Sequence, residues 1–595
     1  MLFYDFEVVE YDWLVVILDM TSQKEHVIIN DPNKLHDFFI EHPTDIWVGF
    51  NNVHYDQYIM KAILCGFNPK EVSDFIILQD KAGWQFSNLF KKIPMINYDV
   101  MERTDRGLKF FEGSLGNMVK ESSIPFDIKR KLTDEEVEEM VRYCRHDVEQ
   151  TVEVFMNRKS DFDAVLGLIK MFPETLSIQD LSLTKAQISA KILECEYVAR
   201  DDEFDLSVLP CIQISKYKKA VEFFLNPKNH DYSNNLTMII AGLEHSIGWG
   251  GIHAGKEKYR NLGQGRQIWH VDVASFYPRL MIFHNLLTRN SRKPEKFKMI
   301  YDKRIELKHA GKKKEQAPLK IVINGTYGIS KAVTSKAYDP RNANLICMNG
   351  QLMLIDLIEH LERIDGFELI QSNTDGLIVS LPDTDEAFEQ MDDICYEWES
   401  RCNMVLEFDE IKAMWGQKDV NNYIFEFTNG KLERKGAYVK ELSALDNDLP
   451  IVNKAVVDYL VKGVPVEKTI GECDDLKEFQ MVRKISSKYT CLLHGGYWES
   501  YKAINPETGR FKTFKKFVGE RKKLNEKCIR IYASKDISDG GVWKVKGANK
   551  IEKVEGTPEH SFIFNDEVNG VKVPAKLDKQ WYIDTAYDRL SGFGV

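Results

Sequence analysis

Two sets of carboxylate-bearing segments follow each other along the chain, and their residue types suit the binding of divalent cations. The upstream set consists of DFE at 5–7, GFNNVHYD at 49–56 and YCRHD at 143–147. The downstream set consists of HVDVASFYP at 270–278, KIVINGTYG at 320–328 and SNTDG at 372–376. Carboxylate oxygens are preferred ligands of hard cations such as Mg²⁺, and pairs of such cations catalyse phosphodiester chemistry. The sequence therefore predicts two separate metal sites that make and break phosphodiester bonds.

Asp5 and Glu7 stand two residues apart in an apolar run, 2–9, that has the composition of a strand. Side chains two residues apart in a strand point to the same face, so both carboxylates can share a cation. Asp56 comes just after a second strand-like run at 46–50. We expect these three carboxylates to meet at one place.

A helix is predicted from residue 133 onward. Thr133 and Glu136 have the spacing of a capping box, and apolar residues then recur at helical intervals. Tyr143 and Asp147 are four residues apart and lie on one face of this helix. Asp147 would be the fourth carboxylate of a two-cation site, and the Tyr143 phenol could orient the attacking water. Acids at strand ends and on helices are commonly just exposed, and only the order of the three segments favours a site.

The downstream set predicts a second site. The apolar run 268–271 leads into Asp272, and we expect this strand to continue until Pro278 ends it. The NTDG sequence at 373–376, between two apolar runs, predicts a hairpin whose tip presents Asp375 next to Asp272. Two carboxylates there could hold Mg²⁺ against a triphosphate.

A helix at about 317–331 lies between these two acids in the sequence. Lys320, Asn324 and Tyr327 fall on one of its faces, where a cation and an amide suit a triphosphate and a ring can stack on a base. Arg304 and Lys308, four residues apart, form a second candidate phosphate stripe. Surface salt-bridge partners are an equally open interpretation of that pair.

The upstream segments resemble the Exo I (DxE), Exo II (Nx2–3[FY]D) and Exo III (Yx3D) motifs of proofreading exonucleases with an RNase H-like fold. The resemblance implies DNA contact by Asn51, which we favour over Asn52, and a position for Lys109, in LKFFE at 108–112, near the scissile phosphate. The implied catalytic residues, of which the carboxylates are also the metal ligands, are Asp5, Glu7, Asp56, Asp147 and Tyr143.

The downstream segments resemble motifs A (Dx2SLYP), B (Kx3NSxYG) and C (YxDTDS) of family B DNA polymerases. The resemblance implies Asp272 and Asp375 as catalytic metal ligands, joined by the backbone carbonyl of Val273. Tyr277 would be the steric gate against the ribose 2′-hydroxyl. The implied dNTP-binding residues also include Ser275, Phe276, Lys320, Asn324 and Tyr327, with Arg304 and Lys308 from the second stripe. GWGGIHAG at 248–255 and RKGAY at 434–438 resemble DNA-contacting elements, which implies DNA contact by Gly250, Gly251, Lys435 and Tyr438.

Five positions depart from the family patterns: Phe276, Gly325, Asn373, Gly376 and Gly436. A glycine inside a helix costs roughly 1 kcal/mol relative to alanine, so at Gly325 we expect close approach of DNA or backbone. Asn373 and Gly376 motivate an alternative, a nuclease-only enzyme with a degenerate polymerase palm. A non-enzymatic DNA-binding scaffold and a primase-like start without a primer are further alternatives.

The expected fold is multidomain α+β: an RNase H-like 3′→5′ exonuclease domain followed by a right-hand polymerase with palm, fingers and thumb. A chain of 595 residues is too long for one core. The expected parts are the exonuclease (1–160), a helical connecting region (161–245, with a helix over 183–199), palm (246–286 and 332–440), fingers (287–331), and thumb with C-terminal elements (441–595).

The net charge of −11 does not exclude nucleic acid, because contact depends on local basic surface. The segments 308–320 and 509–530 are basic, and the second has nine Lys or Arg against two Glu. A solvated face is the alternative for each; next to two metal sites we favour phosphate contact. Phe479-Gln480 and the second segment, with Lys515, Lys516 and Lys522, are expected to grip duplex DNA.

The expected function is DNA synthesis on a nucleic-acid primer with 3′→5′ proofreading. It implies two Mg²⁺ per active site, with Mn²⁺ as a substitute, and primer-template DNA, dNTPs and single-stranded DNA as partners. The intervals 272–320 and 328–373 are short, which implies no terminal-protein primer, and a clamp, helicase or single-strand-binding protein as accessory partners. The sequence has no signal peptide and no apolar run that could span a membrane, and its cysteines are scattered. These features favour the cytoplasm. Compactness favours a phage-type enzyme in its host's cytoplasm.

Overall fold

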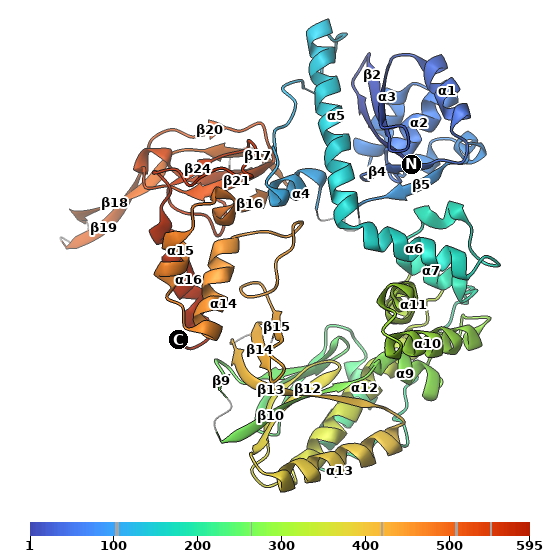
Figure 1. Cartoon of the computed structure of the whole chain (residues 1–595), viewed down its shortest axis with the longest axis vertical. Coiled ribbons are helices and arrows are strands. Elements are labelled where there is room, and N and C mark those ends of the chain that lie inside the picture. Colours follow the sequence, from blue (N-terminus) through green and yellow to red (C-terminus); the bar gives the residue numbers. More distant parts are fainter. Residues whose placement is uncertain (102–105, 126, 263–264, 418–420, 506–509, 548–549) are drawn as a thin grey trace. The chain divides into compact units, whose positions relative to one another are not determined.

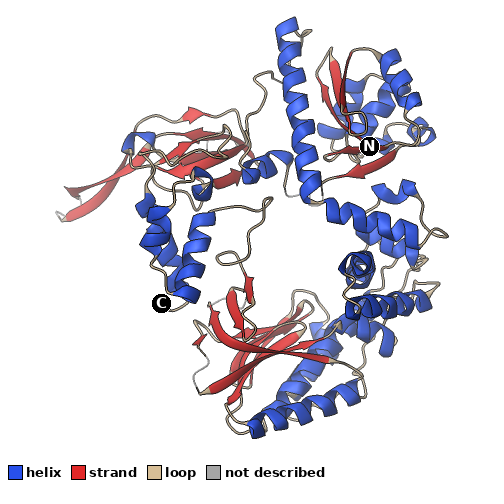
Figure 2. Cartoon of the chain, viewed as in Figure 1, coloured by secondary structure: helices blue, strands red, loops and turns tan. Residues whose placement is uncertain are grey.

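The computed structural model describes residues 1–595 except 102–105, 126, 263–264, 418–420, 506–509 and 548–549. The chain divides into two compact units (Figures 1 and 2). Unit 1 contains Met1–Phe162, Leu442–Tyr459 and Gly463–Ala586, and unit 2 contains Asp163–Glu441, Leu460–Lys462 and Tyr587–Val595. None of the described helices is both long and apolar enough to cross a membrane.

A mixed five-stranded sheet forms the N-terminal part of unit 1. Its strand order is β3-β2-β1-β4-β5, with β1 antiparallel to β2 and parallel to β4. The strands are β1 (Leu2–Val8), β2 (Trp13–Asp19), β3 (Lys24–Ile29), β4 (Ile46–Gly49) and β5 (Ile96–Asp99). The helices of this part are α1 (Pro32–Glu41), α2 (Asp56–Leu64), α3 (Pro69–Ile77), α4 (Leu108–Leu115) and α5 (Asp134–Asn157).

The predicted capping box begins α5. Glu136 N donates to Thr133 Oγ1 at 3.3 Å, and Thr133 N donates to Glu136 Oε2 at 2.9 Å. The buried stripe of α5, which includes Met140, Cys144 and Val148, packs against β1 and β2. The helix therefore carries Asp147 to the face of the central strand β1, which carries Asp5 and Glu7.

The C-terminal part of unit 1 is mainly antiparallel sheet. Its strands are β16 (Met481–Lys484), β17 (Tyr489–His494), β18 (Tyr497–Ile504), β19 (Phe511–Val518), β20 (Lys522–Lys523), β21 (Cys528–Ala533), β22 (Val542–Lys546), β23 (Lys550–Lys553) and β24 (Ser561–Ile563). They form the sheets β16-β21-β24, β20-β17-β22-β23 and β18-β19. The helices α14 (Pro450–Lys462), α15 (Val466–Glu472) and α16 (Lys579–Gly592) complete the C-terminal region.

This C-terminal part packs on the segment that follows α4. Val119 N donates to Asn565 O at 2.8 Å, and Val568 N donates to Gly116 O at 2.8 Å. The Gln480 amide donates to Ser114 O at 3.1 Å. Gln480 and Phe479 are fully buried, so the expectation that they line a duplex-gripping surface is wrong; their apolar and amide groups are used inside the fold.

Unit 2 is built on a long antiparallel sheet, β15-β14-β13-β10-β12-β11-β8-β7-β6, with β9 paired to β13. The strands are β6 (Asn235–Ile240), β7 (Leu243–Gly248), β8 (Gly251–Gly255), β9 (Arg260–Asn261), β10 (Arg266–Val273), β11 (Glu368–Ser372), β12 (Gly376–Pro382), β13 (Leu406–Gly416), β14 (Tyr423–Phe427) and β15 (Leu432–Lys435). Two long helices, α12 (Pro340–Leu361) and α13 (Asp385–Cys402), pack against this sheet (Figure 1). Almost every residue of α12 is buried, so it is the core helix of unit 2.

Three helices follow β10 in the sequence: α9 (Phe276–Phe283), α10 (Pro294–His309) and α11 (Lys313–Lys331). The turn between α10 and α11 contains Gly311 at a positive φ of 68°, a conformation that glycine adopts without strain. The helix predicted over 317–331 is confirmed and starts one turn earlier. Pro318 is tolerated inside it, and α11 packs against α7 (Lys185–Ile192).

The expected helical connecting region, 161–245, is helical only in part. It contains α6 (Lys159–Met171), α7 and α8 (Lys218–Leu225), but it ends in β6 and β7. The helix expected over 183–199 is too long, because α7 stops at Ile192 and Cys195 pairs with Ser291 in an isolated bridge. Tertiary pairing here overrides the helical pattern of the sequence.

Candidate active sites

The first cluster of carboxylates in unit 1 joins β1 and α5. Asp5, Glu7 and Asp147 each offer an oxygen such that the three oxygens lie within 4.8 Å of one another. The alternation of β1 places Asp5 and Glu7 on the same face, as predicted. This geometry brings together residues that are far apart in the sequence and fits one or more divalent cations.

Asp56, the first residue of α2, completes the cluster. Its Oδ1 accepts a hydrogen bond from Phe6 N at 3.1 Å, which fixes the carboxylate beside β1. Burial raises the pKa of Asp56 to about 7. Burial, and then the neighbouring Asp56 and Glu7, raise the pKa of Asp5 well above its ordinary value. A bound cation would offset the repulsion between these carboxylates and favour their ionised forms.

Lys109 supplies a positive charge to the same cluster. Its Nζ donates to Asp147 Oδ1 at 2.7 Å, lies 3.2 Å from Glu112 Oε1, and sits 4.6 Å from the centre of the Tyr143 ring. Burial alone would lower the pKa of Lys109, but Asp147 and Glu112 raise it above its ordinary value. Lys109 therefore lies beside these carboxylates, and its expected position near the scissile phosphate stays a prediction.

Sequence reasoning missed two residues of this cluster, Glu112 and His146. Glu112 is fully buried on α4, and neither of its side-chain oxygens accepts a hydrogen bond from a described residue. Its ionic contacts are with Lys109 and with His146 Nε2, which lies 3.5 Å from Oε2. The available signals were the three-residue spacing from Lys109 on a helix and the position of His146 next to Asp147.

The Tyr143 ring lies beside Lys109 at the border of the cluster. Its hydroxyl donates to Glu121 Oε2 at 2.9 Å. Asn51 is half-buried with a positive φ of 63°, and its backbone N donates to Asp99 Oδ1 at 2.8 Å. Asn52 is fully buried and its amide donates to Tyr4 and Asn97. Of the two, only Asn51 has a side chain that a DNA strand could reach.

In unit 2, adjacent strands bring Asp272 and Asp375 together. Asp272, near the end of β10, pairs with Gly376 of β12, and Val273 N donates to Asp375 O at 2.8 Å. Asn373 N donates to Gly376 O at 2.9 Å, which closes the predicted hairpin between β11 and β12. Burial, and then the neighbouring Asp375, raise the pKa of Asp272 to about 7.

The strand predicted to run to Pro278 is shorter than expected. β10 ends at Val273, Ser275 takes a left-handed conformation with φ 53°, and α9 begins at Phe276. Pro278 lies in the first turn of α9, where its missing N–H costs nothing. The side chain of Phe276 is buried, and its contact with dNTP stays a prediction.

The aromatic rings of motifs A and B meet. The centres of the Tyr277 and Tyr327 rings are 4.5 Å apart. Lys320 and Asn324 are exposed on the same helix, α11, so the predicted face exists. Gly325 faces α7, but an added Cβ would meet only Ser189 Oγ at 3.5 Å. Close approach of a backbone is therefore not the reason for that glycine.

Arg304 and Lys308, the second candidate phosphate stripe, lie in different environments. Arg304 Nη1 donates to Ser275 Oγ at 3.4 Å, which places it beside the loop between β10 and α9. Lys308 Nζ donates to Glu407 Oε1 at 2.8 Å. The salt-bridge interpretation thus holds for Lys308, whereas Arg304 adjoins motif A.

Glycines allow close packing around Asp272 and Asp375. At Gly376, an added Cβ would lie 2.9 Å from Val271 O and 3.0 Å from Asp272 Oδ1. Gly251, with φ 138°, turns the chain into β8 where a Cβ would lie 2.9 Å from Thr374 Oγ1. Gly250 meets nothing within 4 Å. The GWGG turn therefore abuts the motif C hairpin.

The RKGAY segment contains β15 and the turn after it. Lys435 Nζ lies 5.9 Å from the centre of the Tyr423 ring, and Tyr438 is 39% exposed with the Arg589 guanidinium 5.0 Å from its ring. Gly436 has φ 98°, and a Cβ there would lie 2.0 Å from Asn422 Oδ1. The departure from the family lysine at this position therefore has a local steric cause.

The basic segment 509–530 begins at a residue outside the described part of the chain and continues through β19, β20 and β21. Lys515 and Lys516 are exposed on β19, and Lys522 is exposed on β20. Lys516 Nζ lies 3.1 Å from Glu499 Oε2. All three lysines lie on the C-terminal strands of unit 1.

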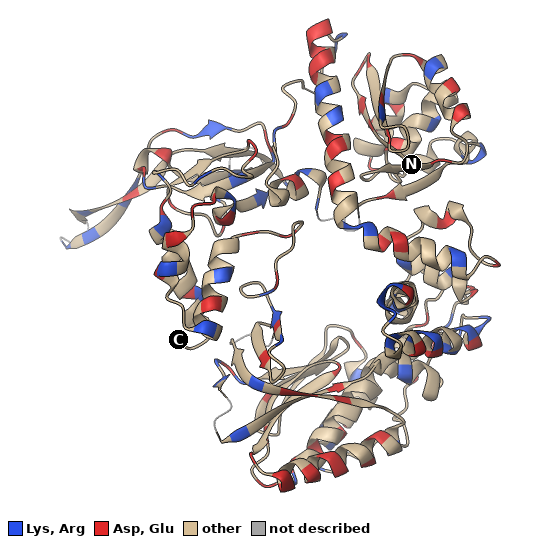
Figure 3. Cartoon of the chain, viewed as in Figure 1, with Lys and Arg blue, Asp and Glu red and all other residues tan. Residues whose placement is uncertain are grey.

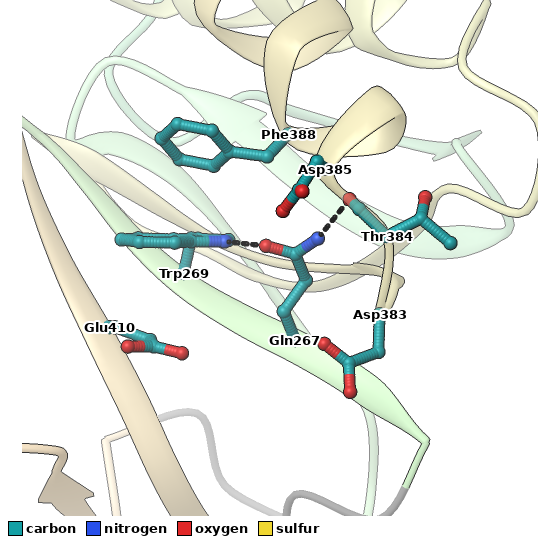
Figure 4. A pocket seen from close by; sticks show the side chains of 7 residues that line it. All are labelled: Gln267, Trp269, Asp383, Thr384, Asp385, Phe388 and Glu410. Carbon is teal, nitrogen blue, oxygen red and sulfur yellow. Dashed lines mark hydrogen bonds between the residues drawn. The ribbon is translucent and has the colours of Figure 1, made fainter.

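A cavity of about 490 Å³ opens at the other end of β10 (Figure 4). Trp269 donates its indole N–H to Gln267 Oε1 at 2.8 Å, and its ring lies 4.9 Å from that of Phe388. The acidic side chains that border the cavity belong to Asp383, Asp385 and Glu410. Since Asp272 lies toward the opposite end of the strand, this cavity is separate from the motif A and C acids.

The chain is similar to two curated proteins. DNA polymerase 1 of Saccharolobus solfataricus is 23% identical over 510 residues, which are 78% of this chain and 53% of the relative. DNA polymerase 1 of Sulfurisphaera ohwakuensis is 26% identical over 187 residues, 31% of this chain and 20% of the relative. These similarities agree with the order of the motifs and with the pairing of Asp272 with the motif C hairpin. The sequence similarity is therefore to DNA polymerases.

The chain spans about half the length of the Saccharolobus relative. No protein-family model matches it. The structure of the family B DNA polymerase from the hyperthermophilic archaeon Pyrobaculum calidifontis aligns with 100% of this chain and 77% of its own, at 14% identity and a TM-score of 0.41. That likeness is too distant to add to the argument.

Proposed function

We propose that this chain is a template-directed DNA polymerase that extends a nucleic-acid primer with dNTPs and removes mispaired ends by 3′→5′ hydrolysis. The observation that carries the proposal is the pairing of Asp272 with the hairpin that bears Asp375. A half-buried Asp272 and an exposed Asp375 at the end of a strand pair, with the half-buried Arg304 beside the adjoining loop, suit a metal-bound triphosphate better than any neutral ligand.

Asp272, Asp375 and the backbone carbonyl of Val273 would hold Mg²⁺, with Mn²⁺ as a substitute. The raised pKa of Asp272 fits a site that needs a cation to stay ionised. When bound, the two cations would activate the primer hydroxyl and neutralise the departing pyrophosphate.

The other residues of unit 2 would orient the substrates. Lys320 and Arg304 would bind phosphate oxygens, since Arg304 contacts Ser275 of the motif A turn and Lys320 is exposed on α11. Tyr277, buttressed by Tyr327, would present a fixed ring edge to the sugar and exclude a 2′-hydroxyl. Asn324 would contact the nascent base pair. A ring held by another ring loses little entropy on binding, which suits a gate.

For hydrolysis, Asp5, Glu7, Asp56 and Asp147 would hold the second pair of cations. Lys109 would bind the scissile phosphate or neutralise excess negative charge as the strand enters, and Tyr143 would orient the attacking water. Asn51 would contact the single strand. The close approach of one oxygen each from Asp5, Glu7 and Asp147 supports this assignment. Partners that we propose are primer-template DNA, dNTPs and single-stranded DNA, with a clamp, helicase or single-strand-binding protein for processivity.

Primer extension tests the polymerase. With Mg²⁺ and dNTPs, the wild-type chain should extend a matched primer, and Asp375→Asn should lower the rate by at least about 10³-fold, because a direct metal ligand is lost. Asp383→Asn, an acid in the loop after β12, is the matched control and should extend normally. Extension that survives in Asp375→Asn would overturn the assignment, and a chain that degrades single strands but never extends would favour the nuclease-only alternative.

A further inference from the structure

The ribbon formed by β18 and β19 carries exposed aromatic side chains next to basic ones. It is a two-stranded sheet that pairs with no other described strand, and it extends away from its neighbouring sheet (Figure 1). Trp498, Tyr501, Ile504 and Phe511 are 47%, 45%, 58% and 76% exposed. An isolated two-stranded ribbon is at best marginally stable in water, so large apolar side chains kept on it call for a ligand.

The base of the ribbon is anchored firmly. The Arg521 guanidinium lies 3.7 Å from the centre of the Phe517 ring and 4.3 Å from that of Trp543, and the two rings are 5.7 Å apart. Trp498 packs edge-on against Phe517 at 5.4 Å. These contacts hold the proximal end to β22 and leave the distal end, toward Ile504 and Phe511, without such support.

The register defines what each face presents. Tyr501 pairs with Phe514, Ala503 with Lys512, and Glu499 with Lys516, so these side chains share one face. The Tyr501 and Phe514 rings are stacked at 5.8 Å with an angle of 27° between them. The opposite face carries the pairs Ile504–Phe511, Lys502–Thr513 and Ser500–Lys515. Each face therefore combines flat rings with lysines.

The charge of the ribbon is strongly positive within an acidic chain (Figure 3). The strands β18 and β19 carry four basic side chains, Lys502, Lys512, Lys515 and Lys516, against the single acid Glu499. Among the described residues, Lys516 is the one of these that has an ion-pair partner, Glu499. The unneutralised charge complements a polyanion.

We propose that the β18–β19 ribbon binds single-stranded DNA by stacking bases on the Tyr501–Phe514 pair while the flanking lysines contact phosphates. Aromatic rings interleaved with lysines form the usual platform for a single strand, whose bases are free to stack. Duplex DNA hides its base faces, and a protein strand added to the ribbon edge would not need the surplus of lysines. The inference deepens the proposed function, because a polymerase meets single-stranded template ahead of synthesis.

The test measures binding of fluorescein-labelled oligo-dT by anisotropy in EDTA, where metal-dependent hydrolysis is blocked. Tyr501→Ala/Phe514→Ala should weaken binding about tenfold or more, since stacking contributes roughly 1–3 kcal/mol per base and 1.36 kcal/mol is tenfold. Binding to a blunt duplex should change far less. Lys512→Gln/Lys515→Gln should flatten the dependence of binding on salt.

Tyr396→Ala removes a tyrosine that is 70% exposed on α13, and it should bind oligo-dT like the wild type. Unchanged oligo-dT binding in Tyr501→Ala/Phe514→Ala overturns the proposal. Loss of concentration-dependent self-association in that variant, with unchanged oligo-dT binding, would instead make the ribbon a contact between copies. If thermal melting shows that the double variant is unfolded, the lysine variant and its salt dependence decide. Ribbon-dependent oligo-dT binding by a chain that extends no primer would sink the polymerase and leave this inference standing.

Discussion

Carboxylates that lie close to one another define both candidate sites at the scale of single residues. Asp56 and Asp272 have pKa values raised to about 7 by burial, and burial also raises the pKa of Asp5 and Glu7. In a folded chain without bound cations, these groups hold protons that the unfolded chain would release. These carboxylates therefore suit cation binding better than packing in an apolar core.

This has a consequence for stability against pH. Because the folded pKa of Asp56 and Asp272 lies above the unfolded value near 3.8, their contribution is fully present below that value and is lost as the pH rises through about 7. In EDTA, the melting temperature should fall between about pH 5.5 and about pH 8. Mg²⁺ should raise it more at the higher pH, because ionised carboxylates bind the cation. Equal Mg²⁺ effects at both pH values would contradict this.

Glu112 is expected to hold Lys109 in place. Its buried carboxylate lies 3.2 Å from Lys109 Nζ, which in turn donates to Asp147. Glu112→Gln should reduce single-strand hydrolysis by about 10- to 100-fold, the usual effect of losing a residue that orients a ligand. Primer extension by the same protein should be unchanged, and Glu138→Gln, exposed on α5, should hydrolyse like the wild type. Normal hydrolysis by Glu112→Gln would show that Lys109 needs no second carboxylate.

At the scale of elements, sequence patterns predicted what depends on local periodicity. The capping box, the stripe of α5 and the NTDG hairpin are present as expected because each is specified by residues close in the sequence. The end of β10 and the end of α7 were predicted wrongly. A left-handed Ser275 and a bridge from Cys195 to Ser291 depend on tertiary partners that no local pattern reveals. Glu112 was missed although its three-residue spacing from Lys109 on a helix was a local signal.

Departures from family patterns can also be weighed at this scale. Gly436→Lys would restore the family residue, but its Cβ would lie 2.0 Å from Asn422 Oδ1 at a φ of 98°. We expect a lower melting temperature, with a cost of about 1–3 kcal/mol, and no gain in DNA affinity. Asn373→Asp keeps an acceptor for Thr374 N and should melt like the wild type. Tighter DNA binding by a stable Gly436→Lys protein would contradict the steric explanation.

At the scale of the whole molecule, unit 1 joins residues from both ends of the chain. Arg530 is fully buried and donates to the carbonyls of Phe564, Asp566 and Asn117. Val119, Val482 and Cys528 form a small apolar core around the same junction. The segment after α4 and the C-terminal sheets therefore pack together. The order of motifs along the chain did not predict this packing.

Arg530→Ala should loosen both sides of this junction together. Leaving the three carbonyls without their donor costs about 1–3 kcal/mol for each buried group that finds no substitute. Hydrogen exchange should accelerate in α4 as well as in β21. Lys120→Ala, which removes the partner of Asp566 in an exposed pair, should leave exchange in both elements almost unchanged. Acceleration confined to β21 would show that the two parts unfold independently.

The central claim is that two separate carboxylate clusters perform two opposite reactions. A single gel with a mismatched primer-template, Mg²⁺, and the presence or absence of dNTPs tests it on three proteins. Wild type should trim and then extend, Asp5→Ala should extend matched primers without trimming, and Asp375→Ala should trim without extending. If either substitution abolishes both reactions in a protein that melts normally, the two clusters do not act as separate catalytic centres.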